Sequence, residues 1–265
     1  MRKYIAVFRI TAINILRYRW EIIMGQVRTI ILLVTLFFLW NKVYEGNQTL
    51  FNFTHQEILT YVFLAAITRL IVTVSATDQI AGELQSWGKF FSYLLKPIGY
   101  FRYWFTVDIV YKIINLFLIV ATTAIFLKIA NFSLIFPTDP NLILRFLVAV
   151  ILGSLIYFYI GIIISTTGFW TSHVWGLQFL VVLTMEFSAG AYFPIDVLPQ
   201  TLQQIIKITP FPYLLYFPVE IYLGKLSAAE SFNVIFISTI WLLVTFLVAK
   251  FIWKKGLASY EAWGG

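Results

Sequence analysis

The sequence has no cysteine, only two histidines, and charged residues at just 12% of its 265 positions. The lack of cysteine excludes disulfides and thiolate metal ligands. The sequence also lacks an H-E-x-x-H zinc signature, a Ser/His/Asp arrangement and any dense group of acidic residues. We therefore expect neither a metal site nor catalytic residues on this chain.

Apolar side chains are what the sequence has in abundance. Hydrophobic residues make up 60% of the chain, and the mean hydropathy is +0.86, well above that of a soluble domain. The net charge of +7 does not indicate a nucleic-acid partner, because the basic residues lie next to apolar runs and form no separate basic domain. The composition predicts a single domain over residues 1–265, embedded in the lipid bilayer.

Runs of about 20 apolar residues recur along the chain, and each is long enough as a helix to cross the roughly 30 Å of hydrocarbon. The runs should be helical, because an open sheet cannot satisfy its backbone in lipid. We predict an all-α integral membrane fold whose six transmembrane helices cover about residues 21–42, 57–76, 103–127, 142–165, 174–193 and 232–252.

The distribution of lysine and arginine predicts that both termini are cytosolic. The basic residues then expected on the cytosolic side are Arg2, Lys3, Arg9, Arg17, Arg19, Lys89, Lys96, Arg102, Lys250, Lys254 and Lys255. Fewer are expected outside: Lys42, Lys128, Arg145, Lys207 and Lys225. Residues 1–20 should form a basic amphipathic helix along the inner interface, which either only anchors the first span or gathers other helices around it.

Residues 194–231, between the fifth and sixth spans, are too apolar for an ordinary loop and too interrupted to span. Pro194 and Pro199 each block a continuing helix, and Asp196 favours a turn between them, shortly after Gly190. The run LPQTLQQIIKI restarts a short helix, and a second stop follows at TPFP. We predict short re-entrant helices that form an outer cap, because irregular backbone at membrane depth must be covered by protein or water.

Several of these runs together resemble the permease (transmembrane) subunit of the ABC type-2 export class, and in particular the small bacterial drug-export permeases. The residues that carry the resemblance are Gly190 and Pro194 in a G-x-x-x-P pattern, PIDVLPQTLQ, PFPYLLYFPVEIYLGK and the ending WKKGLASYEAWGG. The resemblance implies a multi-pass protein of the prokaryotic inner membrane and a dimer with a second permease copy, identical or homologous. It also implies two P-loop ATPase subunits, which hold the ATP and magnesium.

The chain itself has no phosphate-binding loop. Its two Gly-Lys pairs, Gly88-Lys89 and Gly224-Lys225, are followed by Phe90 and Leu226 and lack the upstream glycine. We therefore expect no enzyme activity and no cofactor on this chain, with ATP hydrolysis on the partner subunit.

The resemblance also implies that the loop at 77–102 carries the coupling helix that docks on the ATPase. The loop has an acidic start, helically spaced apolar residues and a stop at Pro97. Its apolar side should contact an apolar surface, either the lipid interface or a partner protein. The acidic start favours a partner protein as that surface. The proposed coupling residues are Asp78, Gly82, Glu83, Leu84, Trp87, Phe91, Leu94 and Leu95.

Three basic residues fall inside the predicted spans, where a charge is costly. Arg28, Arg69 and Lys112 either reach the cytosolic interface by snorkelling or line an inner vestibule. Asp108 and Lys112 stand four residues apart with the acid first, which predicts a structural pair on one helix.

Glu186 lies deep in the fifth span and is followed by the small residues Ser188 and Gly190. A carboxyl group at that depth should be protonated or paired with a cation. It is either a contact for a cationic cargo or a hydrogen bond between packed helices. With Ser188, Arg69 and Arg28 it forms the predicted substrate path.

The sequence thus predicts the membrane subunit of an ATP-driven exporter of amphipathic cargo, cationic and drug-like molecules included. An ATP-independent secondary transporter or channel should show inverted repeats or helices broken at mid-membrane. A membrane scaffold protein is the third alternative. Co-purification of an ATPase discriminates the exporter from both.

Overall fold

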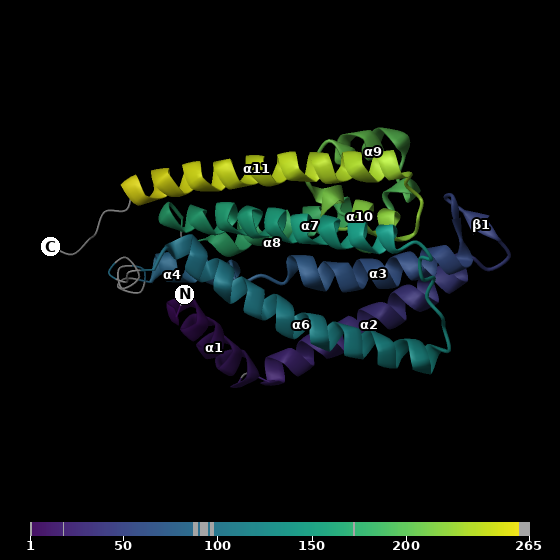
Figure 1. Ribbon diagram of the computed structural model, residues 1–265, viewed down its shortest axis with the longest axis horizontal. Helices are drawn as coiled ribbons and strands as arrows, with labels where there is room; N and C mark the ends of the chain where they lie inside the picture. Colours follow the sequence, from purple (N-terminus) through teal and green to yellow (C-terminus); the bar gives the residue numbers. More distant parts are fainter. Residues whose placement is uncertain are drawn as a thin grey trace.

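The computed structural model describes residues 2–17, 19–86, 90, 95, 98–171 and 173–259. Most of them lie in helices that run along one long axis (Figure 1). One end of the bundle, here the basal end, holds the N-terminus, α1 (Arg2–Arg17), α4 (Asp78–Gln85) and the last turns of α11 (Ala228–Ser259). The opposite end, here the cap end, holds a hairpin of β1 (Thr49–Leu50) and β2 (Phe53–Thr54), α9 (Gln200–Lys207) and α10 (Tyr216–Tyr222).

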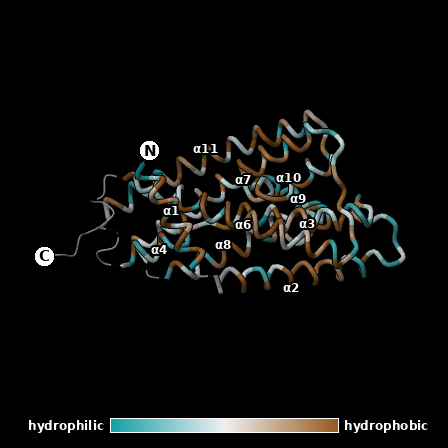
Figure 2. The backbone as a smooth tube through the Cα atoms, turned by 60° about the horizontal axis from the view of Figure 1, so that its bottom comes forward, coloured by the Kyte–Doolittle hydropathy of each residue, from teal (hydrophilic) through white to brown (hydrophobic). Residues whose placement is uncertain are grey.

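Among the described residues, five helical segments are long and apolar enough to cross a membrane. They contain α2 (Arg19–Val43), α3 (His55–Thr73) continued by α4, α6 (Tyr100–Ala130), α7 (Pro140–Thr166) and α11. Their surfaces carry many exposed large apolar side chains, and hydrophobic positions run along their length in Figure 2. This arrangement confirms the prediction of a mainly helical, multi-pass membrane protein. The hairpin of β1 and β2 was not predicted.

The helix expected at 174–193 is shorter than predicted. α8 (Val174–Ser188) has 15 residues, which cover about 22 Å as a helix and fall short of the hydrocarbon thickness. The chain turns at Gly190, whose φ of 76° is open to glycine and strained for most other residues. The count of six spans therefore stays a prediction.

α3 and α7 form the centre of the bundle. α7 packs along α11 and also contacts α3, α4 and α10. Gly161 of α7 lies so close to the junction of α3 and α4 that a Cβ there would be 2.1 Å from Thr77 Oγ1. Ser165 donates a hydrogen bond to the Thr77 carbonyl oxygen at 2.7 Å, one turn further along α7. α4 is thus held on α7 by close packing.

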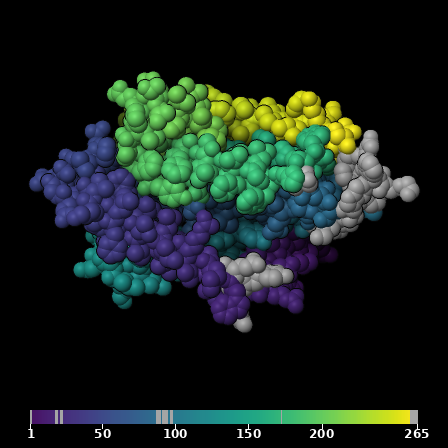
Figure 3. Space-filling view, turned by 180° about the vertical axis from the view of Figure 1, so that it is seen from behind, coloured from purple at the N-terminus to yellow at the C-terminus, as the bar shows by residue number. Residues whose placement is uncertain are grey.

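Of residues 194–231, predicted as an outer re-entrant cap, 194–227 form the segment here called the cap, with α9 and α10 as its short helices, and 228–231 begin α11. That the cap lies on the outer side and is re-entrant stays a prediction. From behind, the cap and α8 cover one side of the bundle (green in Figure 3). The Tyr216 hydroxyl donates to Asp196 at 2.8 Å, and Tyr61 of α3 donates to the Gly190 carbonyl oxygen at 2.8 Å. Leu214, Leu215 and Val219 are completely buried, so the cap packs as part of the core.

Candidate functional site

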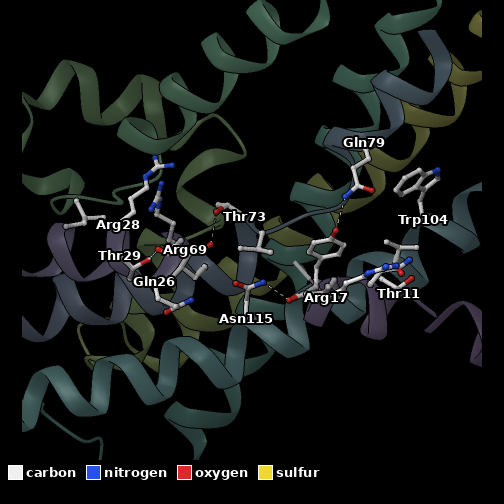
Figure 4. Close-up of a pocket in the computed structure, with 18 of the residues that line it drawn as sticks. Thr11, Arg17, Gln26, Arg28, Thr29, Arg69, Thr73, Gln79, Trp104 and Asn115 are labelled. Atoms are coloured by element: carbon white, nitrogen blue, oxygen red, sulfur yellow. Dashed lines mark hydrogen bonds between the residues drawn. The ribbon is translucent and has the colours of Figure 1, made fainter. Parts of the chain in front are cut away.

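A cavity of about 960 Å³ opens in the basal half of the bundle. Its walls come from α1, the basal half of α2, the basal end of α3, α4 and the basal half of α6, with Tyr192 from the segment after α8. Figure 4 shows the polar side chains that face it. The volume lies in the range of sites for drug-sized molecules.

The lining of this cavity mixes polar and apolar groups. Many polar side chains are already bonded nearby: Thr29 donates to the Gly25 carbonyl at 3.0 Å, Asn115 to the Tyr111 carbonyl at 2.9 Å, and Gln79 to the Tyr111 hydroxyl at 2.9 Å. These bonds fix the side chains without a ligand and reduce the cost of polar groups at membrane depth. The apolar part of the wall is formed by Ile15, Ile31, Leu32, Leu70, Trp104 and Val107.

Arg69 and Glu186 form an ion pair beside the cavity. Arg69 of α3 donates from Nε to Glu186 Oε1 at 2.9 Å, and a second guanidinium nitrogen contacts the same oxygen. Tyr192 donates its hydroxyl to the other carboxylate oxygen. Both charged side chains are largely buried, at 14% and 11% exposure. The sequence left Glu186 either protonated or paired, and the structure shows it paired.

The backbone after α8 explains how this group assembles. Glu186 lies in the last turn of α8, and the turn at Gly190 brings Tyr192 back onto it. Trp40 of α2 donates its indole N–H to the Tyr192 carbonyl oxygen at 3.3 Å. The group therefore joins α2, α3 and α8 at the deep end of the cavity.

Two further arginines line the cavity without an acidic partner. Arg28 of α2 and Arg17 of α1 are both exposed, and neither forms an ion pair with any side chain that the structure describes. The sequence left open whether Arg28 and Arg69 line a vestibule, and the structure places both on this cavity. Ser188, the fourth predicted path residue, is half-buried on α8 and does not line it.

Lys112 has a structural role, as its pairing with Asp108 predicted. Its Nζ lies 3.4 Å from Asp108 and donates to the carbonyl oxygens of Val72 and Val74 at 2.9 and 2.8 Å. Asp108 accepts from the Ser75 hydroxyl and from the Ala76 backbone N–H. Together they form hydrogen bonds with the backbone groups that are left unpaired where α3 ends and α4 begins.

The predicted coupling residues fall into three groups. Asp78 and Gly82 are exposed on α4, Glu83 is half-buried there and lines the cavity, and Leu95 is 73% exposed. Leu84 is buried within the chain at 6% exposure, so it anchors α4 and presents no surface. Trp87, Phe91 and Leu94 lie outside the described residues.

Several residues of the site were missed from the sequence. Gln26, Thr73, Asn115 and Tyr192 line the cavity, and Gln26 also accepts a 2.8 Å hydrogen bond from Thr122 of α6. Gln26, Thr73 and Asn115 could have been predicted, because they are polar residues at similar depth in three spans. Phe90 was also missed: it is completely buried against the rings of Tyr100, Phe169 and Trp253.

The fold and the cavity define a multi-pass helical membrane protein with a mixed polar and apolar chamber at one end. The model of the family described as "ABC-2 family transporter protein" matches residues 30–264. The match covers nearly the whole chain, so the protein belongs to this family. A search of the curated proteins found no match. Membership makes the chain a membrane component of an ABC transporter, and it implies association with an ATP-binding subunit.

Proposed function

We propose that this chain is the transmembrane subunit of an ATP-driven exporter, and that the cavity is its inward-facing substrate chamber. The basal end is then cytosolic, as the excess of basic residues predicts, in the inner membrane of a prokaryote. Two P-loop ATPase subunits act below it, and a second permease copy completes the membrane part. The cargo is amphipathic and drug-like, because the chamber combines an apolar wall with fixed polar groups.

The observation that carries this proposal is the position of α4. This short helix exposes Asp78 and Gly82 at the basal end, while Gln79 and Glu83 on the same helix line the cavity. α4 also packs on α7 through Gly161 and Ser165. A force applied to the exposed face of α4 would thus reach both the chamber and the central helix.

Arg69 and Tyr192, which both bind Glu186, lie at the deep end of the chamber. Passage toward the cap end requires the pair to separate or to move with its helices, since its groups join α2, α3 and α8. In this proposal, ATP binding on the partner drives that movement through α4. The cationic cargo expected from the sequence would need Glu186 to be released from Arg69.

Gly82 offers a sharp test of coupling through α4. It is exposed, and a Cβ built on it meets nothing within 4 Å, so the fold tolerates a side chain there. Gly82→Trp should block docking and abolish transport-coupled ATPase activity in the complex purified from its native membrane. Gly82→Ala, the matched control, should keep it, and both variants should melt at the temperature of the unaltered chain.

The proposal is contradicted if the unaltered chain purifies without an ATPase. It is also contradicted if Gly82→Trp keeps full coupling, since a bulky side chain on a docking face cannot be neutral.

A further inference from the structure

The charges around the chamber are unbalanced. Among the side chains that the structure describes, three arginines line it, Arg17, Arg28 and Arg69, against one acid, Glu83. Glu186 neutralises Arg69 from behind, which leaves Arg28 as a guanidinium with no acidic partner among the described residues. The described charged groups in and beside the chamber therefore sum to a net positive charge, which attracts an anion more than a cation.

Arg28 lies near the deep end of the chamber. Figure 4 shows its side chain and that of Arg69 at the same end, away from Gln79 and Trp104. Both arginines lie close enough to Tyr192 for their charges to act on its hydroxyl. An acid bound here would meet Arg28 directly, whereas a cation would face two guanidinium groups and only one carboxylate, which Arg69 and Tyr192 already occupy.

The apolar wall begins next to this charge. Leu32 of α2 stands one turn from Arg28, Leu70 of α3 follows Arg69, and Val107 and Trp104 continue the surface on α6. A ligand that satisfies both parts has a negatively charged head and an apolar body. A guanidinium binds carboxylate, sulfonate and phosphate oxygens well because its N–H groups form a planar fork.

We propose that the chamber selects amphiphiles with an anionic head, and that Arg28 is the residue that binds the head. This assignment rests on the proposed function for the direction of transport, but the binding step can be measured without it. The head can belong to a soluble amphiphile or to an anionic membrane lipid, since both offer the same oxygens to Arg28.

The test compares two fluorescent probes with the same apolar body, pyrenebutyrate and pyrenebutyl-trimethylammonium. Binding is measured to the purified chain in phosphatidylcholine nanodiscs without ATPase or nucleotide. The unaltered chain should bind the anion at least about tenfold more tightly than the cation. Arg28→Gln should lower the affinity for the anion by about tenfold or more, as expected for a lost charged hydrogen bond. It should not lower the affinity for the cation.

Two variants control for structure and for net charge. Arg28→Lys keeps the charge and should retain most of the affinity for the anion. Lys128→Gln removes one positive charge at the far end of α6, outside the chamber, and should change neither affinity. Nanodiscs of phosphatidylglycerol identify the source of the head: competition with the anionic probe assigns a lipid, and unchanged binding assigns a soluble amphiphile.

The proposal is overturned if the cation binds as tightly as the anion, or if Arg28→Gln weakens both probes equally. Such a result would leave the exporter assignment standing, because coupling is tested separately at Gly82. Conversely, if no ATPase partner is found and the chain still binds the anion more tightly, the binding-site proposal stands and the proposed function is contradicted.

Discussion

At the scale of single residues, the buried pair of Arg69 and Glu186 is the feature on which the site depends most. Its two charged side chains come from helices far apart in the sequence and are 14% and 11% exposed. Removal of one partner leaves an uncompensated charge in a poorly solvated place, whereas removal of both leaves none. The pair should therefore behave as a unit in stability measurements.

Glu186→Leu alone should destabilise the protein by about 3–5 kcal/mol, because Arg69 is left unpaired. The double variant Arg69→Met with Glu186→Leu should recover much of that loss. The measurement is reversible unfolding of the purified chain in mild detergent. Lys42→Met is the control, since Lys42 pairs with Glu45 at the exposed surface, where a pair contributes about 0–1 kcal/mol. Additive losses in the double variant would show that the two side chains do not stabilise each other.

At the scale of helices, coupling depends on α4 and on its packing contact with α7, here called the seat. The sequence predicted a coupling helix in the loop at 77–102, and the structure shows a helix over Asp78–Gln85. Its apolar side, with Ile80, Ala81 and Leu84, is buried within the chain. Helical spacing alone could not distinguish a side chain that faces a partner from one that faces α7. The distinction depends on tertiary packing, here on a glycine at position 161.

Gly161→Ala should weaken this seat. Its Cβ would be 2.1 Å from Thr77 Oγ1 and 2.9 Å from Thr77 Cβ, so α7 and the start of α4 must separate, at an expected cost of about 1–3 kcal/mol. We expect a lower melting temperature together with weaker coupling to the ATPase.

Gly176→Ala in α8 is the matched control, because its Cβ meets nothing within 4 Å and should change neither property. Thr77→Gly should restore the seat when combined with Gly161→Ala. If Gly161→Ala lowers neither the melting temperature nor the coupling to the ATPase, the close packing of α7 and α4 does not contribute to stability or coupling.

At the scale of the whole molecule, hydropathy predicted the membrane helices well because span length and lipid solvation leave few alternatives. The prolines and Gly190 likewise predicted the break between α8 and α11, since they act on the local backbone. The predicted end of the fifth helix at residue 193 was wrong: α8 ends at Ser188 and the chain turns at Gly190, and the apolar residues Ala191, Tyr192 and Phe193 had been counted as helix. The site was only partly predictable: Arg28, Arg69 and Glu186 were singled out by their charge, but which of them meet depends on how α2, α3 and α8 pack.

The proposed transport cycle requires one chamber that opens at the basal end and closes when the partner binds ATP. Since the chain has no cysteine, single cysteines can report on it without further changes. Asn115→Cys places a thiol in the chamber, and Ala229→Cys places one on the exposed start of α11 at the cap end. The reagent is a membrane-impermeant maleimide, applied from either side of membrane vesicles that contain the complex.

The thiol at position 115 should react only from the cytosolic side without nucleotide, and should become protected when ATP is bound to a hydrolysis-deficient ATPase. The thiol at position 229 should react only from the outer side in both states. Reaction at position 115 that is unaffected by ATP, or that occurs from the outer side without nucleotide, would contradict an inward-facing chamber that ATP binding closes.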